Sequence, residues 1–308
     1  MIVSFSKVAL SRESTFLLIV LLLSLNSCKQ VSINLEGNLC EEDLSYLKNW
    51  DWENTYIPPY SWPLGTAFAK GLYVDVAFDS LGVAVKDNKI VFSLNPLLPI
   101  PPTNPESKFN YRSEIRTAPW NIEHPLGTEQ WIGWSYTFSQ DYKINLSEPI
   151  TIYQNHPGIM GESPQFELEI AGKDRPRPAK GGEIQIVNNA MGTRDIRSFT
   201  PQAGETYIFV VHLIYGFMED GYLQVWINDQ IVYDKRVSTA FSTYPWGGNN
   251  KWGLYHHSHN GDSMAVKNTL DQNISQVEIR MGPLKLLTRA PDYSTYLKDA
   301  YNLVRPDL

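Results

Sequence analysis

The chain has 308 residues, of which 43% are hydrophobic, 12% aromatic and 19% charged. This composition is typical of a globular protein and is too apolar for a disordered one. The formal net charge is -7 and no run of Lys and Arg occurs, which argues against a nucleic-acid-binding protein. The length suits one large β domain or two domains of average size.

The N-terminus carries the features of an export signal. Basic residues precede the apolar run 16–23, which is too short to span a membrane as a mature helix. Residues 25–28, Leu-Asn-Ser-Cys, resemble a bacterial lipobox, with Leu three positions before the Cys and a small residue directly before it. The resemblance implies that residues 1–27 form a lipoprotein signal peptide and that Cys28 is lipidated. Cys40 is the other cysteine, so a lipidated Cys28 leaves no intrachain disulfide.

We therefore expect an extracytoplasmic protein that a lipid anchor holds at the periplasmic face or the outer-membrane surface. An ordinary secretory signal with a chance cysteine is the alternative. Residues 28–56 are predicted to be a tether and N-terminal segment, and residues 57–308 a single domain. The proline-rich stretch 96–105 is interpreted as a long connection within that domain, because the strands before it are too few to close a core.

A hydrophobic period of two dominates the chain from residue 57 to about residue 288, and this period predicts strands. The clearest alternations lie at 131–138, 165–170, 207–214, 222–227 and 277–281. Tight reversals are expected at residues 87–88 and 228–229. A short helix is expected at 293–304. Helices do not alternate with strands, so the pattern predicts an all-β fold, a sandwich or jelly roll.

Three of the predicted strands place polar side chains on one face. Because strand side chains alternate, residues two apart lie on the same side. These side chains are Arg112, Glu114 and Arg116 in the first strand, Gln154 and His156 in the second, and Lys251, Tyr255 and His257 in the third. Gly253 lies between Lys251 and Tyr255 and is expected to leave room for a ligand near the backbone. By the same period, Asn155 points to the opposite face and is assigned no role.

Together these residue types suit elimination across a uronic acid. The proton on carbon 5 of a uronate is barely acidic, so an enzyme must neutralise the neighbouring carboxylate and stabilise the developing negative charge. It must also provide a base for that proton and an acid for the departing oxygen 4. Arg, Gln or His performs the first task, His or a deprotonated Tyr the second, and a neutral Tyr the third.

The three strands also resemble the signature motifs of the jelly-roll polysaccharide lyases. Arg-Ser-Glu-Ile-Arg (112–116), Gln-Asn-His (154–156) and Lys-Trp-Gly-Leu-Tyr (251–255) follow the order of the alginate lyases of that fold. The wider pattern at 131–135 and 220–228 is more similar to the heparin lyase I and glucuronan lyase group. The resemblance implies a concanavalin-like β-jelly-roll sandwich that cleaves a 4-linked uronic-acid polysaccharide by β-elimination.

The resemblance also implies roles for single residues. Arg112 and Gln154 would neutralise the carboxylate, and His156 would neutralise it or act as base. Tyr255 would be the acid, and also the base in a syn elimination. The expected substrate-binding residues are Glu114, Arg116, Lys251 and His257. The acidic net charge would repel a polyanion, so binding would depend on this local basic cluster.

Two other functions remain open at this point. A non-catalytic carbohydrate-binding sandwich would use the same polar residues for hydrogen bonds only. A glycoside hydrolase of the same architecture would use Glu167 and Glu169, which share a strand face but lack the third acidic residue of the glucanase motif.

No metal site is predicted, because His256, His257 and His259 do not converge. No cofactor is required, although a calcium site near Asp262 is an open possibility. The expected partner is an anionic polysaccharide, with membrane contact through the lipid anchor alone, no nucleic acid and a monomeric state.

Overall fold

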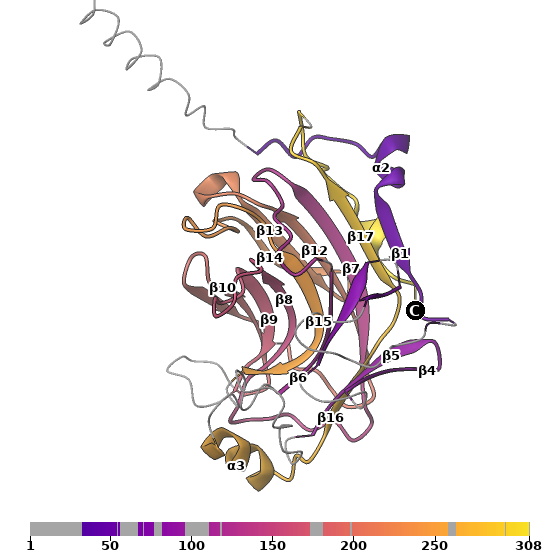
Figure 1. Ribbon diagram of the computed structural model, residues 1–308, viewed down its shortest axis with the longest axis vertical. Coiled ribbons are helices and arrows are strands. Elements are labelled where there is room, and N and C mark those ends of the chain that lie inside the picture. The colour runs from indigo at the N-terminus through magenta and orange to yellow at the C-terminus, as the bar shows by residue number, and fades with distance from the viewer. Residues whose placement is uncertain are drawn as a thin grey trace, which may run out of the picture. The chain divides into compact units, whose positions relative to one another are not determined.

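The structure is a computed structural model that describes residues 33–53, 55, 67–69, 71–76, 82–95, 111–117, 119–172, 181–197, 199–257, 263–292 and 294–307 (Figure 1). The predicted signal peptide, Cys28, the connection 96–105, and His259 and Asp262 therefore lie outside the described residues. Residues 33–308 form one compact unit, in which two antiparallel sheets pack face to face.

The larger sheet has nine strands among the described residues. They are β1 (Leu47–Trp50), β4 (Val83–Lys86), β5 (Lys89–Leu94), β7 (Glu129–Phe138), β12 (Thr206–Ile214), β13 (Tyr222–Ile227), β14 (Gln230–Arg236), β16 (Val277–Met281) and β17 (Leu284–Arg289). Their order is β14-β13-β12-β7-β16-β5-β4, and β17 pairs with both β7 and β1.

The second sheet has eight strands in the described part of the chain. They are β2 (Ala67–Phe68), β3 (Leu72–Val76), β6 (Tyr111–Thr117), β8 (Ile150–His156), β9 (Phe166–Ile170), β10 (Ile184–Asn188), β11 (Thr193–Ile196) and β15 (Asn249–His256). Their order is β11-β10-β9-β8-β15-β6-β3-β2, so the three strands that carry the predicted motifs, β8, β15 and β6, are neighbours. The predicted all-β jelly-roll architecture is confirmed.

Helices are short and peripheral. Those described are α2 (Glu41–Ser45), α3 (Ser263–Asp271), α4 (Tyr301–Val304) and the 3-10 turn η1 (Met218–Asp220). The helix expected at 293–304 is thus reduced to its last four residues. No helix in the described part of the chain is long and apolar enough to cross a membrane. The two predicted reversals are present, and all four of their residues, 87–88 and 228–229, have positive φ, as type I′ hairpin turns require.

Residues 33–53, which the sequence analysis places in the tether and N-terminal segment, belong to the fold. β1 pairs with β17 along its whole length. Trp50 and Trp52 are buried in the core, and the Trp52 indole donates a hydrogen bond to the carbonyl of Gly282 at 2.6 Å. The local sequence does not predict this, because the pairing of β1 with β17 and the contact of Trp52 with Gly282 join residues more than 200 positions apart.

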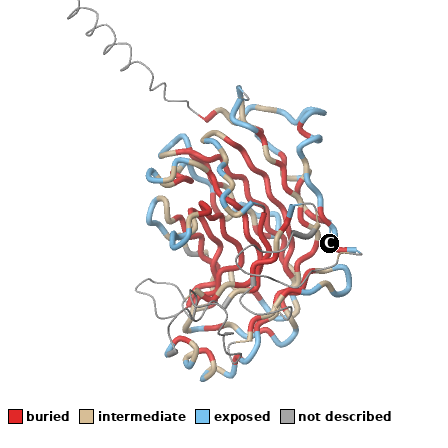
Figure 2. Tube along the Cα trace, in the orientation of Figure 1, coloured by how far each residue is buried: buried red, intermediate tan, exposed pale blue. Residues whose placement is uncertain are grey.

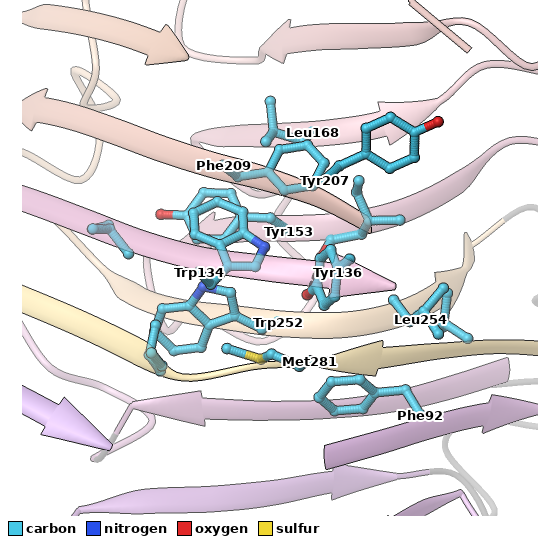
Figure 3. Packing of buried hydrophobic residues seen from close by; sticks show 14 of the residues in the cluster. Phe92, Trp134, Tyr136, Tyr153, Leu168, Tyr207, Phe209, Trp252, Leu254 and Met281 are labelled. Carbon is cyan, nitrogen blue, oxygen red and sulfur yellow. Dashed lines mark hydrogen bonds between the residues drawn. The ribbon is translucent and has the colours of Figure 1, made fainter. Parts of the chain in front are cut away.

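The core lies between the two sheets, and the buried residues run along the strands (Figure 2). Trp134 of β7 stacks on Phe209 of its own sheet and on Tyr153 of the other, with ring centroids 5.4 and 4.9 Å apart (Figure 3). Trp252 and Leu254 of β15 also point into this core. Since side chains alternate along a strand, Lys251 and Tyr255 are directed to the opposite side, which we call the polar face.

The backbone, and not only space for a ligand, explains why glycine occupies position 253. Its φ is +136°, and an added Cβ would lie 2.2 Å from the carbonyl oxygen of Ser113. Its N–H donates a hydrogen bond to the Tyr136 hydroxyl at 2.9 Å. The register between β15 and β8 also shifts between Trp252 and Tyr255. Glycine is therefore required by the backbone at this irregularity.

Candidate active site

Strand β15 brings the three predicted motifs together. Tyr255 lies opposite Arg112 of β6, and Lys251 lies opposite Arg116 on β6 and Gln154 on β8. Directly opposed residues in an antiparallel pair lie on the same face of the sheet. These five predicted residues therefore share the polar face, although they come from segments up to about 140 residues apart in the sequence.

Arg112 and Tyr255 form the most accessible pair of this set. The guanidinium carbon of Arg112 lies 4.3 Å from the centroid of the Tyr255 ring. On its other sides Arg112 contacts carboxylates, with Nη1 3.2 Å from Asp75 and Nε 2.9 Å from Glu114. Burial alone would lower the pKa of Arg112, but Asp75, Glu114 and Tyr255 outweigh it and raise that pKa. Arg112 is therefore a permanent cation beside a half-buried phenol.

Lys251 is fully buried beneath this pair. Its ammonium donates a hydrogen bond to Asp75 Oδ2 at 2.9 Å and lies 4.0 Å from Glu114. It also lies 4.5 Å from the centroid of the Trp120 ring. Burial and the charge of Arg112 lower the pKa of Lys251, while Asp75 and Glu114 oppose that change. The predicted direct contact between Lys251 and substrate stays a prediction, and the ammonium is already held by protein carboxylates.

Gln154 lies opposite Lys251 and is bound by Glu114. Its Nε2 donates a hydrogen bond to Glu114 Oε1 at 2.5 Å. Burial raises the pKa of Glu114, and the charge of Asp75 adds to this effect, whereas Arg112 and Lys251 oppose it. Glu114 therefore binds both Gln154 and Arg112, the two groups that are predicted to neutralise a carboxylate, and orients them on the polar face.

His156 has both ring nitrogens engaged. Nδ1 accepts a hydrogen bond from the Gly158 N–H at 3.1 Å, so the proton of the neutral ring is on Nε2, which lies 3.0 Å from the Glu162 carbonyl. The Trp120 ring covers the imidazole, with centroids 4.7 Å apart. Burial lowers the pKa of His156 well below its ordinary value, and the charges of Lys251 and Arg112 add to this. His156 is thus a neutral hydrogen-bond donor at neutral pH.

Asn155 points into the core. Its amide nitrogen donates hydrogen bonds to the Tyr215 hydroxyl at 2.8 Å and to Asn250 Oδ1 at 2.9 Å. This placement agrees with the sequence analysis, which gave Asn155 no role on the polar face. The hydrogen bond between Asn155 and Asn250 joins β8 to β15 on the core side of the sheet. Asn250 directly precedes Lys251, so this bond lies behind the polar face.

A second group of polar residues follows on β9, β10 and β11. Glu169 contacts Gln185, lies 3.6 Å from Arg194 and lies 3.9 Å from His257. Glu167 accepts hydrogen bonds from Thr151 at 3.0 Å and from Asn189 at 3.3 Å. Glu167 and Glu169 are both buried. His257, a predicted substrate-binding residue, is the more accessible member, with 25% of its side chain exposed.

Two residues of the site were not predicted. Asp75 lies on β3 opposite Glu114, and its carboxylate contacts Arg112 and Lys251. The alternation in Tyr73-Val74-Asp75-Val76 could have indicated a buried acidic residue on one strand face. Trp120 follows β6 and covers both His156 and Lys251. Nothing in its local sequence distinguishes it from the other tryptophans.

Among the residues that the structure describes, no cluster of three or more His, Cys, Asp or Glu side chains could hold a metal ion. His256 is directed away from His257, with Nδ1 3.1 Å from the Pro149 carbonyl oxygen. The residues near which a calcium site remained open, 260–262, lie outside the described part of the chain.

Comparison with known proteins identifies the class. The polysaccharide lyase family matches residues 83–277, which is more than half of the chain. The chain therefore belongs to the polysaccharide lyase family, and the predicted enzyme class is confirmed. This result favours a lyase over the carbohydrate-binding sandwich and the glycoside hydrolase. No curated protein matches the sequence.

Solved structures that are similar to this chain include alginate lyases and a glucuronan lyase. Alginate lyase Aly36B with a bound alginate trisaccharide is 14% identical with a TM-score of 0.51, over 79% of this chain and 98% of that one. Alginate lyase A1-II′, a member of polysaccharide lyase family 7, is 13% identical with a TM-score of 0.50, over 71% and 95%. The endo-β-1,4-glucuronan lyase of the fungus Trichoderma reesei is 16% identical with a TM-score of 0.46, over 80% and 98%.

Proposed function

We propose that this polysaccharide lyase cleaves 4-linked uronic-acid chains by β-elimination, with Arg112 and Tyr255 as the residues that act on the substrate. The observation that carries the proposal is the contact between the Arg112 guanidinium and the Tyr255 ring, 4.3 Å apart on adjacent strands. Elimination next to a carboxylate needs a fixed cation and a proton-transfer group within one sugar ring of each other, and this pair meets that requirement.

Arg112 suits the carboxylate of the uronate. A guanidinium presents five N–H donors in a plane and matches a carboxylate by two parallel hydrogen bonds. Its contacts with Asp75 and Glu114 use Nη1 and Nε, so further donors remain for a substrate carboxylate. Negative charge moves onto that carboxylate when carbon 5 loses its proton, and Arg112 is already in position to stabilise it.

Tyr255 is assigned the proton transfers. As a phenolate it removes the proton from carbon 5, and the electron pair of that C–H bond forms the double bond to carbon 4. The bond between carbon 4 and oxygen 4 breaks, and the phenol returns the proton to that oxygen. The products are a sugar with a double bond between carbons 4 and 5 and a new free hydroxyl on the other fragment, so no water is consumed.

The state of His156 favours this single-residue scheme. Its Nδ1 is engaged by Gly158, and its Nε2 carries a proton held by the Glu162 carbonyl, so it is a donor rather than a base. Tyr255 then approaches carbon 5 and oxygen 4 from one side, which is a syn elimination. In D-glucuronate and D-mannuronate those two groups lie on the same face of the ring, whereas in L-guluronate and L-iduronate they lie on opposite faces. We therefore propose a substrate with D-glucuronate or D-mannuronate at the cleaved position.

The test is a substrate panel followed by the ultraviolet absorbance of the unsaturated uronate. Polyglucuronate and polymannuronate are expected to yield absorbing products, and polyguluronate to yield less. New reducing ends without absorbance would indicate a hydrolase instead. Absence of cleavage of every 4-linked polyuronate by folded protein would contradict the proposed function.

The location of the enzyme is a separate proposal. The lipobox-like residues 25–28 support lipid attachment at Cys28, and hence an extracytoplasmic enzyme at a membrane surface. Cys28→Ser is expected to release the protein from membrane fractions and to leave the activity of the soluble form unchanged. Recovery of the parent protein free of lipid in the medium would contradict the anchor.

A further inference from the structure

Asp75 is the common partner of three cations on the polar face. Its Oδ2 accepts a hydrogen bond from Lys251 at 2.9 Å and from Arg112 Nη1 at 3.2 Å, and lies 3.9 Å from Arg116 Nε. These cations come from two strands, β6 and β15, while Asp75 comes from β3. The Asp75 side chain is 4% exposed. It is therefore a buried connection between strands and not a surface ion pair.

The charge of Asp75 is required where it lies. An ammonium as buried as that of Lys251 is unstable without an opposite charge in contact, and its other carboxylate, Glu114, is 4.0 Å away. Burial works to raise the pKa of Asp75, but Lys251, Arg112 and Arg116 outweigh it and hold that pKa well below the ordinary value. Asp75 thus stays ionised, and in turn it opposes the fall in the Lys251 pKa.

Asp75 also fixes the direction of Arg112. The guanidinium is held at Nη1 by Asp75 and at Nε by Glu114, and its central carbon lies over the Tyr255 ring, 4.3 Å from the ring centroid. Two anchoring contacts at different nitrogens define the orientation of a planar group, whereas one contact would let it rotate. Because donors remain on Arg112, Asp75 orients this side chain without occupying it completely.

We propose that Asp75 is a positioning residue of the elimination, which gathers Lys251, Arg112 and Arg116 into the receptor for the substrate carboxylate. This inference rests on the proposed function. Asp75 does not touch the sugar; it acts by holding Arg112 at the distance from Tyr255 that the reaction needs. It was not among the residues that the motifs indicated, and it comes from a strand outside all three motifs.

The test compares Asp75→Asn with Asp43→Asn. Asp43 is a matched control, because it is also a buried carboxylate bound to an arginine, with Oδ1 2.7 Å from Arg289 Nε. It lies in helix α2, and Arg289 belongs to β17 of the other sheet. Both variants are expected to lose stability. Only Asp75→Asn is expected to lower kcat/KM, by roughly 100-fold, the scale for misplacing a reacting group by about 1 Å.

The pH profile separates positioning from simple loss of structure. The charged and titratable groups around Asp75 are Arg112, Glu114, Arg116, Lys251, His156 and Tyr255. Removal of the negative charge lowers the pKa of the Lys251 ammonium further, so Asp75→Asn is expected to lose activity at a lower alkaline pH than the parent. Asp75→Glu restores the charge. In this variant, the pH at which activity is lost on the alkaline side is expected to return towards the parental value. Asp43→Asn is expected to leave this pH at the parental value.

The outcomes are distinct. If Asp75→Asn keeps the parental kcat/KM and pH profile, Asp75 has no part in the reaction. If it binds substrate more tightly with kcat retained, Asp75 competes with the substrate for Arg112, which also overturns the proposal. Failure of the parent enzyme to cleave any polyuronate would contradict the proposed function itself and is seen before any variant is made.

Discussion

Two buried ion clusters occupy opposite sides of this protein. The site cluster consists of Asp75, Arg112, Glu114, Arg116 and Lys251 on the polar face of the eight-stranded sheet. The back cluster consists of Asp43, Glu129, His212 and Arg289 and is built on the nine-stranded sheet. The two clusters are similar in burial, since each contains several buried charged side chains.

The back cluster is closed by the protein itself. Glu129 Oε1 accepts hydrogen bonds from the Trp131 indole at 2.9 Å and the Leu297 N–H at 3.0 Å, and lies 2.8 Å from His212 Nε2. Its Oε2 binds Arg289 Nη1 at 2.7 Å. Glu129 thereby joins β7, β12 and β17 to the C-terminal segment. With its carboxylate oxygens surrounded by protein donors, it has a structural role.

The site cluster differs in charge and in access. It holds three cations against two carboxylates among the described residues, and Arg112 leads from it to the half-buried Tyr255. An excess of cations beside the half-buried Tyr255 favours binding of an anionic sugar. The back cluster has two carboxylates and one arginine, and burial lowers the pKa of His212, so it has no excess of cations. Buried charge therefore indicates a candidate anion site here, where cations are in excess and one of them contacts a partly exposed residue.

The largest effect is expected from a substitution in the back cluster, which should lower stability and leave activity unchanged. Glu129→Gln removes the charge of one of the two carboxylates that lie 2.7 Å from Arg289. It is expected to cost about 3–5 kcal/mol of unfolding free energy, as breaking a buried ion pair does. The protein that remains folded is expected to keep the parental kcat. Urea unfolding and initial rates below the transition provide the check. A large fall in kcat of the folded fraction would mean that the back cluster takes part in the reaction.

The comparison also shows what the sequence could predict. The alternation of Trp252 and Leu254 with Lys251 and Tyr255 was sufficient to place the core and the polar face correctly, because a strand in a sandwich has one apolar side. The hairpins at 87–88 and 228–229 followed from local turn chemistry. In each case the information lies within a few residues of the feature.

The remaining features depend on distant partners. Asp75 joins the site because β3 pairs with β6, and it accepts a hydrogen bond from the buried Lys251. The tautomer of His156 is set by the backbone of Gly158 and Glu162, which no side-chain pattern encodes. Strand β1 forms because β17, more than 200 residues later, provides its partner.

A second prediction concerns stability in acid. Burial, with a smaller contribution from Lys48, lowers the pKa of His124 from 6.5 to about 4. Between those values the unfolded chain binds a proton that the folded protein does not, so stability falls as pH decreases from about 6.5 to 4, by roughly 2–3 kcal/mol for this residue. In His124→Gln, the urea midpoint is expected to decrease less than in the parent as the pH falls from about 6.5 to 4. Above pH 7 the midpoints of the two proteins are expected to depend on pH in the same way. An unchanged slope in the variant would contradict it.

The smallest effect concerns His156. Because His156 acts as a neutral donor, His156→Gln, which retains an N–H donor, is expected to reduce kcat/KM by less than about 10-fold and to leave the shape of the pH profile unchanged. His156→Ala, which loses the donor, is expected to be more damaging. The alternative outcome is a fall of kcat/KM in acid, with a midpoint near the ordinary histidine pKa, that is absent in His156→Gln. That result would identify His156 as the base.

The central claim is that Tyr255 transfers the proton. The most direct measurement is the rate at which unsaturated uronate forms from a polymer that the parent cleaves, compared between the parent, Tyr255→Phe and the control Tyr222→Phe, whose hydroxyl donates to Asp234 at 2.7 Å on the other sheet. Tyr255→Phe is expected to lower kcat by roughly 100-fold or more with little change in stability, and Tyr222→Phe to keep it. A Tyr255→Phe variant with the parental kcat would contradict the account.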